Sequence, residues 1–406
     1  MSKERLLLIV LAAALFTHIM DFMIIMPLGP QLMRIFDITP QQFGFLVSSY
    51  SFAACISGFI TAFVIDRFDR RTSLLFIYAG FTLGTLACGF APDYLILVTT
   101  RCIAGAFGGI LGALILSIVS DAIPLERRAA GIGFVMAAFS MASVFGVPFG
   151  LYLATVSNWH APFIMLGLLG VLINVLIFFV VPSMRGHLVT DTGKSRLSKA
   201  MDMLKAIFVE KGPQTGLIFT FVLMLGHFTI IPYIATYMVG NVGFTEKELT
   251  YIYLVGGGLT IFTSPMVGKL ADRYGRLRIF TIFGILVMVP VYIITNLPPV
   301  PLWTALMASG AFFVLANGRI VPSTTMVTSL IAQNKRGSFM SIRSSVQQLA
   351  TGTASLIGGY LVSETPSVVI DNATALVNYE YAGYFSIAFS IVALLIARNL
   401  KAVKGA

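Results

Sequence analysis

The chain has 406 residues, of which 57% are hydrophobic and only 11% are charged. A soluble domain carries about 25% charged residues, so this composition excludes an ordinary water-exposed globular protein and indicates that most of the surface faces lipid. The net charge of +10 would suggest nucleic-acid binding in a soluble protein, but here the basic residues lie in loops between apolar segments. The three cysteines lie inside apolar segments without metal-site spacing, so neither a zinc site nor a disulfide framework is expected.

Twelve apolar segments are long enough to cross a bilayer, which requires about 20 residues. They cover roughly 6–29, 43–65, 72–91, 94–120, 129–155, 161–182, 214–240, 248–270, 278–296, 301–331, 337–363 and 381–398. The first segment follows a short basic start, as a secretion signal does. It is too long for one, contains His18 and Asp21, and precedes many further spans, so we interpret it as the first helix.

The distribution of Lys and Arg predicts the orientation. With the N-terminus inside, nearly all loop cations fall on the cytoplasmic side, and only Arg34 and Lys247 lie outside. Cytoplasmic loops attract Lys and Arg, so both termini are predicted to be cytoplasmic. The basic charge is therefore a topology signal.

The longest polar interruption, 183–213, separates six spans from six. It predicts three parts: an N-terminal bundle at 1–182, a basic linker at 183–213 and a C-terminal bundle at 214–406. Within the linker, 197–208 alternates apolar and basic faces and predicts an amphipathic helix on the inner membrane surface. The segment 363–380 is predicted to be an outside loop.

One short charged loop occurs twice, half the chain apart. The first copy follows Asp66 with Arg67, Arg70 and Arg71, and the second follows Asp272 with Arg273 and Arg276. Each copy lies between two long apolar segments. A repeat of this kind predicts two similar membrane halves that move against each other.

These features resemble the major facilitator superfamily over essentially the whole chain. The second loop fits that family's Gly-x-x-x-Asp-Arg-x-Gly-Arg pattern completely, whereas Ala62 and Asp69 replace the two glycines of the first. Loss of the second glycine makes the turn less permissive. Arg101-Cys102-Ile103-Ala104-Gly105 looks like the family's Arg-x-x-x-Gly motif, in which the arginine is associated with proton coupling.

Two further segments narrow the resemblance. Gly146-Val147-Pro148-Phe149-Gly150 resembles a motif typical of drug and sugar antiporters, carried by Gly146, Pro148 and Gly150. The segment 21–30 is similar to the first span of twelve-span, proton-coupled, arabinose-efflux-type antiporters.

The resemblance implies an all-α membrane protein with twelve transmembrane helices in two pseudo-symmetric six-helix bundles. It implies a proton-coupled efflux antiporter for small amphiphilic drug-like or sugar-like compounds, working by rocker-switch alternating access. Its partners would be a small-molecule substrate, protons and the lipid bilayer of a bacterial cytoplasmic membrane, without nucleic acid, and it would be a monomer. We expect no cofactor beyond the proton gradient, no metal and no enzymatic activity, because the sequence shows no nucleophile–base constellation, phosphate loop or metal cluster.

The repeated loops predict a cytoplasmic gate. A carboxylate at a helix end accepts hydrogen bonds from the positive N-terminus of a neighbouring helix, which the resemblance implies is span 11 for Asp66 and span 5 for Asp272. Asp121 is placed to pair with one of the loop arginines. The alternative is that these arginines only fix topology. The candidate gate residues are Asp66, Arg67, Arg70, Asp121, Asp272, Arg273 and Arg276.

Ionisable groups deep in spans are costly and usually functional. Asp21 and Arg101 lie at comparable depth in spans 1 and 4, which predicts an ion pair, and protonation of Asp21 would release Arg101 as a proton switch. The alternative is a fixed structural pair. His18, one turn from Asp21, is expected to share the proton or simply to be hydrogen-bonded within the bundle.

The predicted substrate cavity contains Phe22, His227, Tyr233, Asn317 and Arg319. No Asp or Glu lies inside any C-terminal span, so Arg319 and Arg343 have no obvious internal partner. They could bond to carbonyls, Asn317 or Gln347; Arg343 could snorkel to the surface; or one could bind an anionic substrate.

The last possibility defines an alternative function, an importer or exchanger of small organic anions (carboxylate or phosphate) that uses Arg101 and Arg319. A membrane receptor or scaffold without transport would bind a ligand but show no flux.

Overall fold

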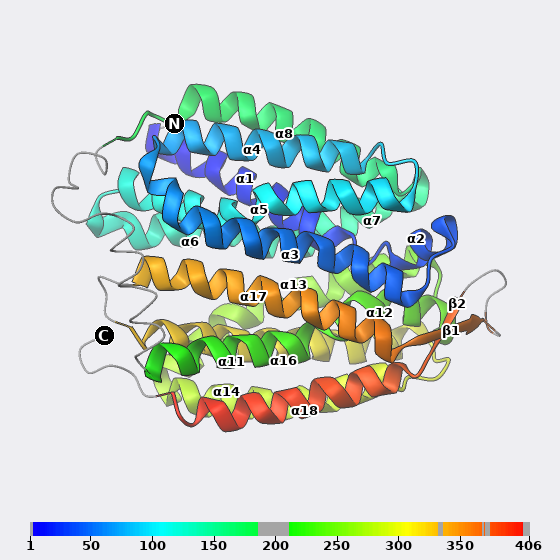
Figure 1. The fold of residues 1–406 in the computed structure, drawn as a ribbon. Helices are drawn as coiled ribbons and strands as arrows, with labels where there is room; N and C mark the ends of the chain where they lie inside the picture. The colour runs from blue at the N-terminus through cyan, green and yellow to red at the C-terminus, as the bar shows by residue number, and fades with distance from the viewer. Residues whose placement is uncertain (1–2, 186–210, 332–335, 368, 370–373, 401–406) are drawn as a thin grey trace. The chain divides into compact units, whose positions relative to one another are not determined.

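The computed structural model describes residues 3–185, 211–331, 336–367, 369 and 374–400 (Figure 1). It contains two compact units, which we treat separately: unit 1 comprises Met1–Ile24 and Ser49–Leu204, and unit 2 comprises Ile25–Ser48 and Lys205–Ala406. Residues 25–48, which the sequence analysis assigned to the N-terminal bundle, therefore pack with the C-terminal part of the chain. The predicted amphipathic helix at 197–208 lies outside the described residues.

Unit 1 is a bundle of long helices. It contains α1 (Lys3–Ile24), the second part of α3 (Pro40–Val64), the 3-10 turn η1 (Ile65–Arg67), α4 (Arg70–Cys88), α5 (Tyr94–Ala122), α6 (Leu125–Met141), the π-helical turn η2 (Ala142–Gly146), α7 (Val147–Val156) and α8 (His160–Val180). Helix α4 packs between α5 and α8, and α1 packs against α6 and α8. Buried Leu, Ile and Val side chains from α1, α4, α5, α6 and α8 form one continuous core.

Unit 2 is a second bundle with a small strand pair. Its helices are α2 (Gly29–Phe36), the first part of α3, α11 (Lys211–Phe228), α12 (Ile231–Tyr237), the π-helical turn η3 (Met238–Val242), α13 (Glu246–Tyr274), α14 (Arg276–Leu286), α15 (Met288–Thr295), α16 (Leu302–Thr328), α17 (Arg336–Leu361) and α18 (Tyr379–Ala397). The strands β1 (Ser363–Pro366) and β2 (Thr374–Val377) pair antiparallel, with Ser363 opposite Val377, inside the segment predicted only as a loop.

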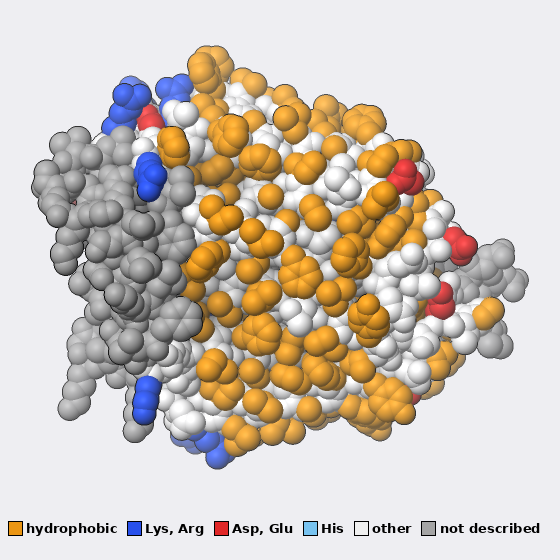
Figure 2. Space-filling view, viewed as in Figure 1, with side chains coloured by type: hydrophobic (Ala, Val, Ile, Leu, Met, Phe, Trp, Pro, Cys, Tyr) orange, Lys and Arg blue, Asp and Glu red, His pale blue; other side chains and the backbone are white. Residues whose placement is uncertain are grey.

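Eleven helical segments among the described residues are long and apolar enough to cross a bilayer. They correspond to the predicted spans apart from 337–363. That segment forms α17, which has 26 residues, but Arg343, Gln347 and several Ser and Thr side chains lower its hydropathy. Figure 2 shows hydrophobic side chains over the sides of the helices and charged side chains at helix ends. Phe179 is 77% exposed and Phe262 78%, which suits a surface covered by lipid rather than water.

Residues 25–48 pack tightly within unit 2. The hydroxyl of Tyr233 on α12 donates to the carbonyl oxygen of Ser355 on α17 at 2.7 Å and approaches that of Pro40 at 3.3 Å. A Cβ atom at Gly44 would lie 2.3 Å from the Tyr233 hydroxyl oxygen. Glycine at this position therefore allows the ring to fit between α3 and α17.

A polar contact adds to this packing. Arg34 and Gln31 on α2 both donate to the carboxylate of Glu246, in the first turn of α13, at 2.8 and 2.5 Å respectively. Arg34, one of the two cations predicted to lie outside, therefore has Glu246 as a structural partner.

Candidate functional site

The ion pair between Asp21 and Arg101 is fully buried in unit 1. Nη1 of Arg101 on α5 lies 2.9 Å from Oδ2 of Asp21 on α1, and neither side chain is exposed. The same Nη1 donates to the Asp21 carbonyl oxygen at 3.2 Å, and the Thr85 hydroxyl on α4 donates to Oδ1 at 3.1 Å. Three helices thus fix one carboxylate, as the similar depth of the two residues predicted.

Tyr50 on α3 completes this cluster, and sequence analysis did not identify it. The Arg101 guanidinium carbon lies 4.4 Å from the centre of the Tyr50 ring. The Tyr50 hydroxyl lies 3.1 Å from Nδ1 of His18, within hydrogen-bonding distance. Among the described residues Nε and Nη2 of Arg101 have no hydrogen-bond partner, so the ring face supplies the second favourable contact of the cation. Tyr50 connects His18 to the ion pair.

The glycines after Arg101 explain how Tyr50 reaches this position. A Cβ atom at Gly105 would lie 2.3 Å from the Tyr50 carbonyl oxygen, and one at Gly108 would lie 2.2 Å from its hydroxyl oxygen. Both glycines therefore permit close approach of α3 and α5. The spacing Arg101, Gly105, Gly108 was the sequence signal that a large side chain from a neighbouring helix packs there.

The antiporter motif packs against α1 beside Asp21. Gly146 ends the π-helical turn η2, and Pro148 lies in the first turn of α7. Cβ atoms at Gly146 and Gly150 would lie 3.0 Å from Sδ of Met20 and 2.8 Å from Cδ1 of Ile24. The motif thus sets the close contact between α7 and the end of α1 that carries the carboxylate.

The predicted cavity residues Phe22 and Tyr233 both contact other aromatic rings. The Phe22 ring lies 5.5 Å from the Tyr50 ring in unit 1. Tyr233, in unit 2, is fully buried in the packing described above. Their roles toward a substrate stay predictions.

Unit 2 contains a second buried cluster around Arg319 on α16. Nη1 of Arg319 donates to the Ser390 hydroxyl at 2.7 Å, and Nη2 lies 3.3 Å from Nδ1 of His227 on α11. The His227 ring stacks on Phe312 with centroids 6.0 Å apart. Nε of Arg319 has no partner among the described residues. Among the described residues, Arg319 therefore contacts Ser390 and His227 but no carboxylate.

The structure does not show two of the arrangements considered for Arg319 and Arg343, a bond to Asn317 and snorkelling to the surface. Asn317 donates to the Ser264 hydroxyl at 2.7 Å instead of contacting Arg319. Arg343 is 7% exposed and does not snorkel; it donates to the hydroxyls of Thr220 and Thr324 at 3.4 and 3.3 Å. Hydroxyl groups from neighbouring helices are acceptors that the sequence pattern did not single out.

The predicted gate residues differ between the two loops. Arg70 pairs with Asp121, with Nε 3.2 Å from Oδ2, and Arg67 is exposed. Asp272, Arg273 and Arg276 are all exposed, and the described residues give them no ion pair. The Asp66 side chain lies outside the part of the structure that can be described.

The two loops also differ in backbone conformation. Gly275 has φ +94°, a conformation that side-chain-bearing residues rarely adopt, whereas Asp69 at the equivalent position has φ −57°. The intact glycine of the second loop is thus required by its turn, and the first loop needs none.

Asp69 instead anchors the start of the linker. Its carboxylate accepts hydrogen bonds from the Arg71 backbone at 2.9 Å, the Met184 backbone at 3.1 Å, Nε of Arg185 at 3.3 Å and the Ser183 hydroxyl. Burial alone would raise the pKa of Asp69, but these bonds outweigh it and lower the pKa to about 2.

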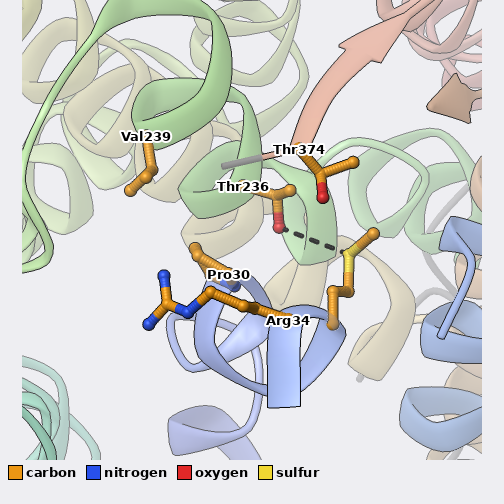
Figure 3. Close-up of a pocket in the computed structure, with 6 residues that line it drawn as sticks. Pro30, Arg34, Thr236, Val239 and Thr374 are labelled. Atoms are coloured by element: carbon orange, nitrogen blue, oxygen red, sulfur yellow. Dashed lines mark hydrogen bonds between the residues drawn. The ribbon is translucent and has the colours of Figure 1, made fainter. Parts of the chain in front are cut away.

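The structure has a small pocket in unit 2 and a groove in unit 1, and neither is lined by the predicted cavity residues. A small pocket of about 10 Å³ lies in unit 2, lined by Pro30, Met33, Arg34, Thr236, Val239 and Thr374 (Figure 3). Within it the Thr236 hydroxyl points to Sδ of Met33 at 3.9 Å. That volume holds at most one water molecule, so it is not a substrate site. The second is a groove on the outside of unit 1.

Comparison with known proteins identifies the family. The model of the Major Facilitator Superfamily matches residues 11–219 and 216–404. The chain belongs to the major facilitator superfamily.

Relatives and solved structures agree with this assignment. The chain is 26% identical over 349 residues to the inner membrane transport protein YdhP of Escherichia coli O157:H7, covering 83% of this chain and 84% of the relative. It is 23% identical over 323 residues to the putative transporter AraJ of Escherichia coli K12, covering 78% and 77%. A crystal structure of a D-xylose-proton symporter superposes with a TM-score of 0.78 at 14% identity, covering 98% and 97% of the two chains. That similarity shows the fold alone.

The protein is therefore a secondary transporter of the major facilitator type. It is a multi-pass protein of the bacterial inner membrane and acts on a small-molecule substrate. The expected resemblance to the superfamily is confirmed.

Proposed function

We propose that this transporter is a proton-coupled efflux antiporter for small amphiphilic drug-like or sugar-like compounds, and that it works as a monomer by rocker-switch alternating access. The observation that carries the proposal is the fully buried Asp21–Arg101 pair, linked to His18 through Tyr50. The carboxylate of this pair lies on the same helix as a histidine, and these two side chains are the groups needed to take up and release one proton.

The proposed coupling step is protonation of Asp21. The ionised carboxylate attracts Arg101 and accepts a hydrogen bond from Thr85. A proton on Asp21 removes the charge and weakens both contacts. The cation–π contact between Arg101 and the Tyr50 ring then remains, and the Tyr50 hydroxyl contacts His18. The proton state of one carboxylate thus changes the packing of four helices.

The energies involved suffice for a switch. A hydrogen bond to a charged group contributes about 1.5–3 kcal/mol. Each 1.4 kcal/mol changes an equilibrium constant about tenfold. Losing one such bond therefore shifts the ratio of two conformers by about ten- to a hundredfold, provided that the bond is present in only one of them.

The decisive experiment is transport in proteoliposomes with an imposed pH gradient. Asp21→Asn should abolish proton-driven accumulation but retain downhill exchange of substrate, because asparagine fills the site without titrating. Asp37→Asn is the matched control, since Asp37 is an exposed residue at the C-cap of α2. If Asp21→Asn retained full proton-driven transport, the coupling proposal would be wrong.

The gate at the predicted cytoplasmic side is part of the same proposal. The Arg70–Asp121 contact supports an ion pair that forms in one state of the cycle and breaks in the other. Asp66 and Asp272 would contribute from the two loops, the first in unit 1 and the second in unit 2.

The runner-up function is import or exchange of small organic anions. Arg319 favours it, because this buried cation meets only Ser390 and His227 among the described residues and an anionic substrate group would neutralise it. Transport that requires a counter-substrate but no pH gradient would support this alternative. A flux screen across dyes, sugars and organic anions would identify the substrate.

A further inference from the structure

A groove runs along the outside of unit 1 between α4 and α8. It has a volume of about 400 Å³ and is lined by Leu75, Ala79, Thr82, Leu83, Val171, Asn174, Val175 and Phe178. Leu83 is 65% exposed and Phe178 53%. In a protein of the inner membrane, exposed apolar side chains on the side of a helix bundle contact lipid. The groove is therefore open to the bilayer.

One amide interrupts this apolar lining. Asn174 is half-buried, and among the described residues its side chain has no hydrogen-bond partner. It lies one helical turn, about 6 Å, from Phe178 along α8. A polar group facing hydrocarbon is unfavourable unless it is hydrogen-bonded, so the amide indicates a ligand with polar atoms at this depth.

A cation lies at the end of the groove marked by Phe178. The Arg71 guanidinium carbon is 4.9 Å from the centre of the Phe178 ring, and Nη2 donates to the Phe178 carbonyl oxygen. Among the described residues, Nε of Arg71 is buried without a hydrogen-bond partner, and no carboxylate forms an ion pair with this arginine. The groove thus ends at a cation that no described residue neutralises.

Arg71, Asn174 and the apolar side chains follow one another along the groove in the same order as the phosphate, the ester groups and the acyl chains of a phospholipid. Arg71 lies in the first turn of α4 and Phe178 lies near the end of α8, the helix ends that the Lys and Arg distribution predicts to be cytoplasmic. Arginine binds phosphate oxygens through charged, directional hydrogen bonds. The apolar lining on α4 extends from Leu75 to Leu83, about 12 Å along the helix axis.

We propose that this groove binds one anionic phospholipid. Its phosphate contacts Arg71, its ester carbonyl groups accept from Asn174, and one acyl chain lies between α4 and α8. The site lies wholly within unit 1, involves none of the groups assigned to proton coupling, and does not depend on the proposed transport mechanism.

The test measures lipid retention by the full-length protein with native mass spectrometry, after purification in mild detergent and addition of phosphatidylglycerol or phosphatidylcholine. The wild type should retain phosphatidylglycerol in preference to phosphatidylcholine. Arg71→Gln should lower phosphatidylglycerol retention roughly fivefold, the effect expected of one basic side chain near an anionic lipid surface. Arg127→Gln is the matched control, because Arg127 lies in the same unit and pairs with Glu4 at 3.0 Å away from the groove.

Two further variants separate the parts of the site. Arg71→Lys keeps the charge and should retain more phosphatidylglycerol than Arg71→Gln does. Ala79→Phe fills the groove and should lower retention of both lipids while leaving Arg71 in place. Equal retention of the two lipids by the wild type, or unchanged phosphatidylglycerol retention in Arg71→Gln, would show only non-specific contact with surrounding lipid and would overturn the proposal.

Discussion

Each unit contains a buried polar cluster around an arginine, and the two clusters differ in charge balance among the described residues. In unit 1, Asp21 on α1 neutralises Arg101 on α5 at 2.9 Å. In unit 2, His227 on the first long helix and Ser390 meet Arg319 on α16, without a carboxylate. A single proton can change the charge of the first cluster from neutral to positive, whereas the second holds a cation that its described protein neighbours do not neutralise. The two units thus differ in how they compensate a buried arginine, and substitutions at these residues test that contrast.

The largest expected effect is at Arg101. Arg101→Met leaves the Asp21 carboxylate buried without its cation and should lower the free energy of unfolding by about 3–5 kcal/mol. Thermal unfolding in detergent would measure the loss. Arg101→Met combined with Asp21→Leu removes both charges and should recover much of the stability. A single variant as stable as the wild type would contradict the ion pair.

Gly108→Ala tests the packing that holds Tyr50 over Arg101. The new methyl group would lie 2.2 Å from the Tyr50 hydroxyl oxygen, and such overpacking typically costs about 1–3 kcal/mol. Gly112→Ala on the same helix is the control, because no atom lies within 4 Å of its Cβ position. That variant should be neutral or stabilising by up to about 1 kcal/mol, since alanine favours helix. Equal unfolding temperatures for the two variants would refute this packing.

The two units also differ in their charged loops, because Asp69 stands in the first loop where the second has Gly275. Asp69 has a pKa lowered to about 2, so its contribution to stability is fully present above about pH 4 and is lost as the pH falls through 2. Asp69→Asn should lower the free energy of unfolding at neutral pH by about 1–2 kcal/mol, allowing for solvent screening at the edge of the unit. Unfolding measured against pH should then show a smaller acid loss in the variant. A difference between variant and wild type that persists unchanged below pH 2 would exclude this titration.

The smallest effect is expected at Arg319. Arg319→Met removes a buried cation that no described carboxylate balances, so the free energy of unfolding should change by no more than about 1 kcal/mol, in either direction. Ser390 keeps a partner, because its hydroxyl donates to the Ser386 carbonyl oxygen at 2.8 Å. The same unfolding assay applies. A loss of unfolding free energy as large as that of Arg101→Met would show that Arg319 has a strong anionic partner. The two units would then not differ in how their buried arginines are compensated.

Sequence patterns predicted the membrane helices because bilayer thickness and apolar composition determine them. They also predicted the meeting of Asp21 and Arg101, since charges at equal depth in a bundle pair with each other. The break between α11 and α12, with Pro232 in the first turn of α12, falls inside the single predicted span 214–240. The Gln and Ser residues of α17, which make this helix less hydrophobic than the other spans, can also be read from the sequence.

Other features depend on contacts that no spacing encodes. Tyr50 was missed because an aromatic residue within an apolar span has no distinguishing pattern; only Gly105 and Gly108 on the partner helix hinted at it. The hydroxyl partners of Arg319 and Arg343 were missed because serine and threonine are common in these helices. Asp69 was recognised as a departure from the loop pattern, but its bonds to Ser183, Met184 and Arg185 require the tertiary fold.

Helix α3 belongs to both units, because the boundary between them falls between Ser48 and Ser49. Gly44, on the unit 2 side, contacts Tyr233, whereas Tyr50, on the unit 1 side, contacts His18 and Arg101. These positions are six residues apart, about 9 Å along one continuous helix. The backbone of α3 therefore runs without a break from the glycine that makes room for the Tyr233 ring to the tyrosine whose own ring covers the Arg101 guanidinium.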